Sequence, residues 1–127
     1  MTIIEVIKNK KQFLSLLLLA DEQENMIDRY LERGTMYVLN DNGVKAECVV
    51  TDECNGILEI KNIATVPEYQ GKGYAKALID FIVKEYADKY SVLQVGTGDS
   101  PLTVPFYEKC GFVRSHICLL YTSPSPR

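Results

Sequence analysis

Histidine is almost absent from this sequence, which has one histidine and four cysteines in 127 residues. No two cysteines form a C-x-x-C pair, and their spacing is not typical of a zinc site. A single histidine, His116, cannot build a metal site alone, and nothing near it suggests a nucleophilic triad. We therefore expect no bound metal. Reduced thiols, the rule in a cytoplasmic protein, are expected at Cys48, Cys54, Cys110 and Cys118.

Long apolar runs and a surplus of basic residues are also absent. The apolar run from Leu14 to Ala20 is far shorter than the ~20 residues that a membrane-spanning helix needs. No basic segment leads into an apolar stretch near the first residue, so we expect no secretory signal, no membrane partner and a cytoplasmic location. The formal net charge of −3 argues against a nucleic-acid partner, which usually selects a basic surface. The length of 127 residues is that of one domain.

The pattern of apolar residues predicts a mixed α/β domain. Two helices follow a first strand, a hairpin signal at residues 40–43 joins two further strands, and an amphipathic helix follows the fourth strand. The predicted order is β-α-α-β-β-β-α-β-α-β, with a right-handed crossover from the fourth strand to a parallel fifth. The strands are expected at residues 2–7, 36–39, 44–51, 57–66, 91–95 and 113–119.

A glycine-containing loop joins the fourth strand to the amphipathic helix, at residues 70–75 (Gln-Gly-Lys-Gly-Tyr-Ala). Gly71 and Gly73 let the backbone turn and approach a ligand closely. The first amides of the helix have no intrahelical partner, and together with the helix dipole they favour a pyrophosphate-sized anion. The loop is not a Walker A motif, because Tyr74 follows Gly73. It is not a dinucleotide fingerprint either, because Lys76 stands where the third glycine should be.

The pattern Q-x-x-G-x-A in this loop resembles the coenzyme A pyrophosphate loop of the GNAT superfamily of acyl-CoA-dependent N-acetyltransferases. A second segment, residues 106–112 (Phe-Tyr-Glu-Lys-Cys-Gly-Phe), resembles the late signature of the same family. The resemblance covers residues 1–117 and implies a GNAT-like mixed central sheet flanked by helices. It also implies acetyl-CoA as cosubstrate, with no metal, and a wedge between splayed fourth and fifth strands that holds the acyl-pantetheine.

The resemblance also assigns roles to individual residues. The pyrophosphate would lie on Gln70, Gly71, Lys72, Gly73, Tyr74 and Ala75. The pantetheine would bind, as an added strand, to the main chain of Ala64, Thr65 and Val66. The amide of Val66 would hydrogen-bond the thioester oxygen.

Tyr107 is the expected general acid, because the family uses a tyrosine at this place to protonate the leaving sulfur. Glu59 lies eleven residues before Gln70, an offset similar to that of the glutamate base in histone-type members; it is either that base or an exposed charge on a strand. Two departures affect Tyr107: Ser100 stands where many members have asparagine, and Pro105 would disturb a helix begun at Pro101.

These residues together predict an N-acetyltransferase that moves an acetyl group from acetyl-CoA to an amine acceptor by direct transfer in a ternary complex. The acceptor is a small-molecule amine or a peptide amine. Two alternatives stay open. One is a non-catalytic acyl-CoA-binding or regulatory domain, and the other is a peptide or protein N-terminal acetyltransferase.

The last residues depart from the family pattern. Residues 118–127 include the polar Ser/Pro segment from residue 121 and resemble translated adaptor sequence, so we expect a non-native or disordered tail. The acetyltransferase domain would then be residues 1–117, incomplete at its C-terminal side because a seventh strand is missing. A sixth strand without a partner leaves an open edge, which would favour a homodimer.

Overall fold

The computed structural model of the chain describes residues 1–95, 104–114 and 119–122. Its elements, with η for 3₁₀ helices, are β1 (Thr2–Val6), η1 (Lys10–Phe13), α1 (Leu14–Ala20), α2 (Glu24–Tyr30), β2 (Thr35–Asn40), β3 (Val44–Asp52), β4 (Ile57–Thr65), η2 (Pro67–Tyr69), α3 (Tyr74–Tyr86), β5 (Val92–Val95), α4 (Val104–Lys109), β6 (Val113–Arg114) and β7 (Leu119–Thr122).

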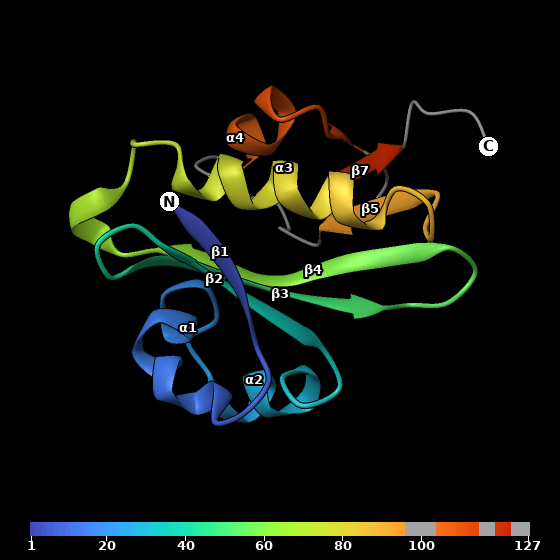
Figure 1. Cartoon of the computed structure of the whole chain (residues 1–127). Helices are drawn as coiled ribbons and strands as arrows, with labels where there is room; N and C mark the ends of the chain where they lie inside the picture. The colour runs from blue at the N-terminus through green and yellow to red at the C-terminus, as the bar shows by residue number, and fades with distance from the viewer. Residues whose placement is uncertain (96–103, 115–118, 123–127) are drawn as a thin grey trace.

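One mixed sheet organises these elements. Its strand order is β1-β2-β3-β4-β5-β7-β6, and among the described pairs only β4 and β5 run parallel. The helices α1 and α2 lie on one face of the sheet, and α3 and α4 lie on the other (Figure 1). The predicted fold class and the predicted order of elements through the sixth strand are confirmed.

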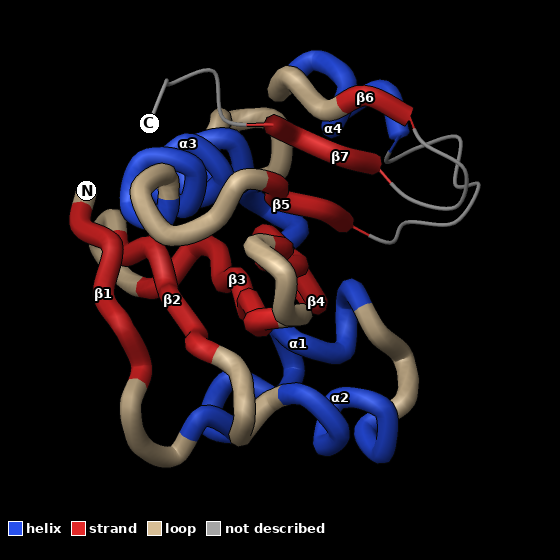
Figure 2. Tube along the Cα trace, turned by 90° about the vertical axis from the view of Figure 1, so that its right-hand side faces the viewer, coloured by secondary structure: helices blue, strands red, loops and turns tan. Residues whose placement is uncertain are grey.

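A seventh strand is present, and its predicted absence is wrong. β7 lies between β5 and β6 and pairs antiparallel with both (Figure 2). Residues 119–122, inside the tail expected at 118–127, form this strand, which their Leu-Leu-Tyr-Thr run suits. That the tail is non-native sequence stays a prediction. Residues 118 and 123–127 lie outside the described residues. The homodimer expected from a partnerless sixth strand loses that basis, because β6 pairs with β7.

Two hydrophobic cores hold the helices to the sheet. On one face, Leu78, Ile79 and Ile82 of α3 are fully buried against β3, β4 and β5. On the other face, Leu17 of α1 and Ile27 of α2 are fully buried against β2 and β3. Each such side chain contributes about 1.5–3 kcal/mol through its removal from water. The sheet is therefore clamped from both sides, which fixes the strands that form the site.

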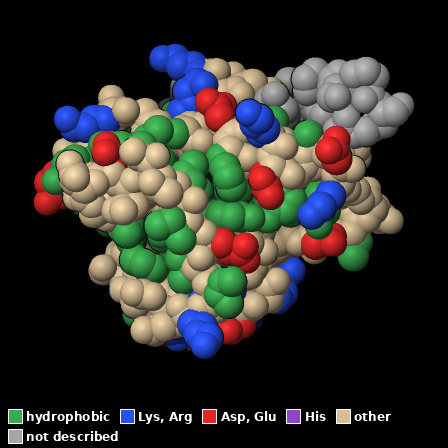
Figure 3. Space-filling view, viewed as in Figure 1, with side chains coloured by type: hydrophobic (Ala, Val, Ile, Leu, Met, Phe, Trp, Pro, Cys, Tyr) green, Lys and Arg blue, Asp and Glu red, His purple; other side chains and the backbone are tan. Residues whose placement is uncertain are grey.

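The sheet edge at β1 is less covered. Ile4 and Ile7 are exposed, and hydrophobic side chains gather across the middle of the face in Figure 3, where β1 lies. Lys, Arg, Asp and Glu side chains are scattered around that area (Figure 3). This edge is remote from β4 and β5, because β2 and β3 lie between β1 and β4.

Lys10 closes the end of α2 from the inside of the fold. Its side chain is only 8% exposed, and Nζ donates to the carbonyl oxygens of Leu31 at 2.9 Å and Gly34 at 2.8 Å. The last carbonyls of a helix have no intrahelical donor, so this ammonium satisfies groups that would otherwise be buried without partners.

Replacing Lys10 by Met should lower the free energy of unfolding by about 1–3 kcal/mol, because two carbonyl oxygens lose their donor in a buried place. Chemical denaturation measures this. Lys8→Met is the control, since Lys8 is exposed, and it should leave stability nearly unchanged. Equal stability of the two variants would mean that Lys10 does not cap α2.

Candidate active site

A cleft of about 900 Å³ runs along β4, between the start of α3 and the end of α1. Its described lining residues are Leu19, Ala20, Ile60, Lys61, Asn62, Ile63, Ala64, Thr65, Tyr69, Gln70, Gly71, Gly73, Tyr74, Ala75, Lys76, Val95, Phe106 and Tyr107. The cleft thus brings together the glycine loop, the fourth strand and α4, which the sequence analysis had singled out separately.

Among the described residues, β4 extends beyond its pairing with β5 along the cleft. The two strands pair only from Ile57 with Val92 to Ile60 with Val95, while β4 continues to Thr65 on its other side against β3. Past Ile60, the outer edge of β4 has no partner among the described residues. The described pairing of β4 with β5 thus ends at Ile60, and the splay of the fourth and fifth strands stays a prediction.

A bulge in β4 marks the same point. Val49 is opposite Asn62 and Val50 is opposite Ile60, so Lys61 has no partner in β3. An extra residue of this kind bends a strand and re-aims the side chains that follow it. Ile60 and Ile63 consequently face α3, whereas Asn62 faces α1 and α2.

The main-chain groups on the open edge are not all those that the sequence predicted. The amide of Val66 donates its hydrogen bond to the carbonyl of Lys45 at 2.8 Å, so it is not free to donate to a thioester oxygen. Because main-chain groups alternate sides along an antiparallel strand, Ala64 also faces β3, whereas Thr65 and Ile63 face the open edge. This hydrogen bond contradicts the role predicted for the Val66 amide, and the main chain of Ile63 joins that of Thr65 on the open edge.

The loop before α3 has the geometry of an anion site. Gly71 and Gly73 have φ angles of 82° and 88°, which favour glycine, and a Cβ at either would meet no heavy atom within 4 Å. The first helical bond runs from the amide of Ala77 to Gly73, so the amides before Ala77 at the start of α3 lack intrahelical partners. The backbone is thus open on the side where a pyrophosphate would approach.

Three side-chain contacts hold this loop in place. The hydroxyl of Tyr74 donates to Asp41 of the β2–β3 hairpin at 2.7 Å, and Nζ of Lys45 lies 4.2 Å from the ring centre of Tyr69. The amide group of Gln70 donates to the carbonyl of Thr65 at 3.5 Å. These contacts connect the loop to β3 and β4, so the anion site and the open strand edge keep a fixed relation.

Tyr107 reaches the cleft from α4. It is 5% exposed, and its ring packs edge-on against Phe106 and Phe112. Burial raises the pKa of its hydroxyl above the ordinary value, so the group is protonated at neutral pH and can donate. α4 spans Val104–Lys109, which places Pro105 in the first turn, where its missing N–H does no harm. The expected disturbance by Pro105 is therefore wrong, and Ser100 lies outside the described residues.

Glu59 does not line the described part of the cleft. Its carboxylate receives a hydrogen bond from Nε2 of Gln94 at 2.7 Å and pairs with Nζ of Lys61 at 3.1 Å. Val66 and Lys72 are likewise not among the described lining residues, whereas the other predicted positions are. Lys61 and Asn62, which do line the cleft, were missed; the signal was two adjacent polar residues in the middle of β4.

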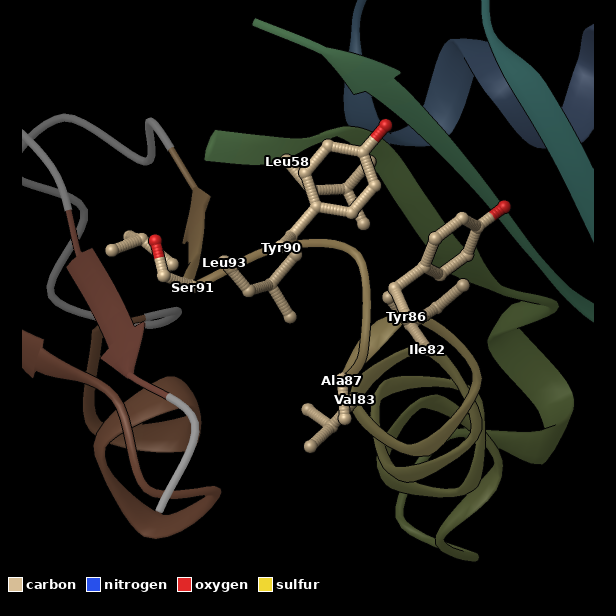
Figure 4. Close-up of a pocket in the computed structure, with 9 residues that line it drawn as sticks. Leu58, Ile82, Val83, Tyr86, Ala87, Tyr90, Ser91 and Leu93 are labelled. Carbon is tan, nitrogen blue, oxygen red and sulfur yellow. The ribbon is translucent and has the colours of Figure 1, made fainter. Parts of the chain in front are cut away.

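A second, apolar pocket of about 20 Å³ lies between α3 and β5. The hydroxyl groups of Tyr86 and Tyr90 point away from Leu93, which lines it (Figure 4). Its volume holds about one water molecule, and it offers too little room for a substrate.

Two further features are absent from the part of the chain that the structure describes. No cluster of three or more side chains able to ligate a metal occurs there. No helix in that part of the chain has the length and apolar character to cross a membrane.

Comparison with known proteins defines the class. The acetyltransferase (GNAT) domain family matches residues 32–114. The chain is 35% identical over 104 residues to a Bacillus subtilis (strain 168) protein described as the uncharacterized N-acetyltransferase YvbK, covering 80% of this chain and 67% of that protein.

Solved structures agree. A GNAT family acetyltransferase from Elizabethkingia anophelis with acetyl-CoA bound superposes with a TM-score of 0.88 at 26% identity, covering 95% of this chain and 97% of that one. A Bacillus subtilis acetyltransferase in complex with CoA superposes with a TM-score of 0.80 at 32% identity, covering 90% and 77%.

The chain therefore belongs to the GNAT acetyltransferase family. The resemblance inferred from residues 70–75 and 106–112 is confirmed, and acetyl transfer is the activity of the class.

Proposed function

We propose that this protein transfers the acetyl group of acetyl-CoA to an amine acceptor, directly and in a ternary complex. The observation that carries this proposal is the continuity of one cleft. It runs from the open amides at the start of α3, along the unpaired edge of β4, to the buried hydroxyl of Tyr107.

Two parts of the cleft suit the two parts of coenzyme A. The pyrophosphate would lie on residues 70–75, where the unpaired amides and the positive end of the α3 dipole favour an anion. The pantetheine arm, which carries amide groups, would pair with the main chain of Ile63 and Thr65 as an added strand. Acetyl-CoA supplies the acyl group as a thioester. The Elizabethkingia anophelis and Bacillus subtilis relatives, with acetyl-CoA and CoA bound, support this assignment.

The acceptor would enter from the other end of the cleft, beside Leu19 and Ala20 of α1. An alkylamine with a pKa of ~10 must lose a proton before it attacks. Tyr107 would donate its proton to the departing sulfur. No cysteine is among the described residues that line the cleft, so the lining gives no support to an acyl-cysteine intermediate.

The contacts of Glu59 favour a positioning role over that of the base. Its two carboxyl oxygens are each engaged, one by Gln94 and the other by Lys61. Lys61 lines the cleft, so Glu59 would act by holding that ammonium in place.

The direct test of the function is turnover with a panel of amines: a simple alkylamine, a diamine, an amino sugar, lysine and a dipeptide with a free N-terminus. Release of free coenzyme A from acetyl-CoA reports transfer. Acetylation of at least one amine supports an enzyme, whereas tight binding of coenzyme A without any transfer supports a non-catalytic acyl-CoA-binding domain.

Gly73→Asp should abolish most coenzyme A binding, because a carboxylate would face the pyrophosphate. Gly73→Asn is the matched control, with the same size and the same backbone strain but no charge. Calorimetry with coenzyme A should show a much larger loss for Asp than for Asn. Unchanged affinity in a folded Gly73→Asp variant would remove the basis for the cosubstrate assignment.

Tyr107→Phe should keep coenzyme A binding but lower kcat by ~10²–10⁴-fold, the usual contribution of a general acid. Tyr86→Phe is the control, since it also removes a hydroxyl, one that bonds to Tyr37, and neither residue is among the described residues that line the cleft. Wild-type turnover in Tyr107→Phe would mean that water protonates the sulfur.

Glu59→Gln should reduce turnover only modestly, and the position of the pH profile of kcat/KM should stay unchanged, because Gln still accepts a hydrogen bond from Lys61. Glu59→Leu should do more damage than Glu59→Gln. Loss of the acidic limb of the pH profile in Glu59→Gln would instead identify Glu59 as the base.

A further inference from the structure

Two buried polar side chains on the α1–α2 face of the sheet lack hydrogen-bond partners for some of their atoms. Asn62 of β4 is 2% exposed, and Glu47 of β3 is fully buried. Oδ1 of Asn62 and both carboxyl oxygens of Glu47 have no partner among the described residues. Buried polar atoms are normally satisfied, so these three call for an explanation.

The orientation of the Asn62 amide is fixed by its neighbours. Nδ2 donates to the carbonyl oxygen of Leu17 at 3.0 Å and to the hydroxyl oxygen of Tyr30 at 3.0 Å. A carbonyl oxygen can only accept, so the nitrogen must face Leu17. The Tyr30 hydroxyl in turn donates to Asp21 at 3.2 Å. Both amide hydrogens of Asn62 are used, and Oδ1 needs a donor.

Glu47 is placed to be that donor. Val49 pairs with Asn62 and Glu47 pairs with Ala64, so Glu47 and Asn62 are diagonal neighbours on one face. Diagonal side chains on paired strands are within reach of a long residue such as glutamate. Tyr30, which bonds to Asn62, also interacts electrostatically with Glu47.

The surroundings of Glu47 favour the neutral form of its carboxyl group. Burial raises its pKa well above the ordinary range, and no described cation offsets this effect. The titratable groups that interact with it are Tyr30, Cys48 and Tyr107, and burial raises the pKa of each of them as well. A protonated carboxyl has one O–H to donate, whereas a carboxylate has none.

We propose that Glu47 is a carboxylic acid that donates its proton to Oδ1 of Asn62, and that Asn62 is a positioning residue for the acceptor end of the cleft. The resulting hydrogen-bonded network runs from Glu47 through Asn62 and Tyr30 to Asp21. The role in the reaction rests on the proposed acetyl transfer.

The position of this hydrogen-bonded network in the fold suits a positioning role. Asn62 holds the carbonyl of Leu17, and Asp21 is the residue that ends α1. Leu19 and Ala20, between these two points, line the cleft together with Asn62. The hydrogen-bonded network therefore holds the end of α1, which forms one wall of the cleft, against β4.

The first test measures the proton. The infrared carbonyl band of a protonated carboxyl group should be present in the wild-type protein at pH 7 and missing in Glu47→Gln. Absence of that band from the wild-type protein would overturn the proposal.

The pH dependence of unfolding checks the same point. The unfolded state ionises Glu47 above about pH 4.5, whereas the folded state keeps the proton, so folding stability falls as pH rises. The unfolding constant of the wild type should therefore grow about tenfold per pH unit relative to that of Glu47→Gln, from about pH 4.5 up to the folded-state pKa. A ratio that does not change with pH would show that Glu47 is ionised in the folded protein.

The second test measures positioning. Asn62→Leu should speed amide hydrogen exchange in residues 14–20 and raise KM for the panel amine that the wild type acetylates by about three- to tenfold, the equivalent of one hydrogen bond. Its affinity for coenzyme A should stay the same. Glu47→Leu should behave like Asn62→Leu, whereas Glu47→Gln should restore the wild-type KM, because its amide can donate to Oδ1.

Thr51→Val is the matched control, since it removes a buried hydroxyl of β3 that bonds to Glu53 and is not part of the hydrogen-bonded network. It should change neither KM nor exchange in residues 14–20. Normal exchange and normal KM in Asn62→Leu would overturn the positioning role. If no amine in the panel is acetylated, the proposed function fails. The infrared band and the exchange rates still decide whether the hydrogen-bonded network is present.

Discussion

The separation of β4 from β5 is the constraint on which the rest of this molecule depends. β4 pairs with β3 to its end, but in the part of the chain that the structure describes it pairs with β5 only as far as Ile60. A strand edge in the middle of a sheet is costly to leave unpaired, since its amides and carbonyls need partners. In this fold the edge forms one wall of a cleft, and under the proposed function a ligand with amide groups supplies the missing hydrogen-bond partners.

Each neighbouring feature supports that separation. The bulge at Lys61 re-aims β4 where its described pairing with β5 ends, and the two hydrophobic cores pack on both faces of the sheet. η2 and the glycine loop then carry the chain from the end of β4 to α3, so the unpaired helix amides lie beside the unpaired strand edge. The strand edge and the helix start thus form one site.

Much of this arrangement could be predicted from the sequence, because local patterns carried it. The glycines of the loop at residues 70–75 and the helix of Tyr107 depend on residues next to them in the chain. The bulge could not be predicted, because it is a property of two paired strands. The mistaken role of the Val66 amide and the omission of Ile63 follow from that bulge, since it decides which main-chain groups face the edge. Asn62 and Glu47 were missed because their importance depends on burial. β7 was missed because its four residues lie directly before the polar Ser/Pro end of the sequence, which predicts no strand.

The central claim is that coenzyme A binds across the loop and the open edge of β4 as one ligand. Titration of isotope-labelled protein with coenzyme A, followed by the exchange rates of individual backbone amides, tests this most directly. The account predicts saturable protection of the amides of Ile63, Thr65 and the first turn of α3. The amide of Val66, already bonded to Lys45, should not gain protection. Protection limited to the loop, or the absence of saturable binding, would contradict the account.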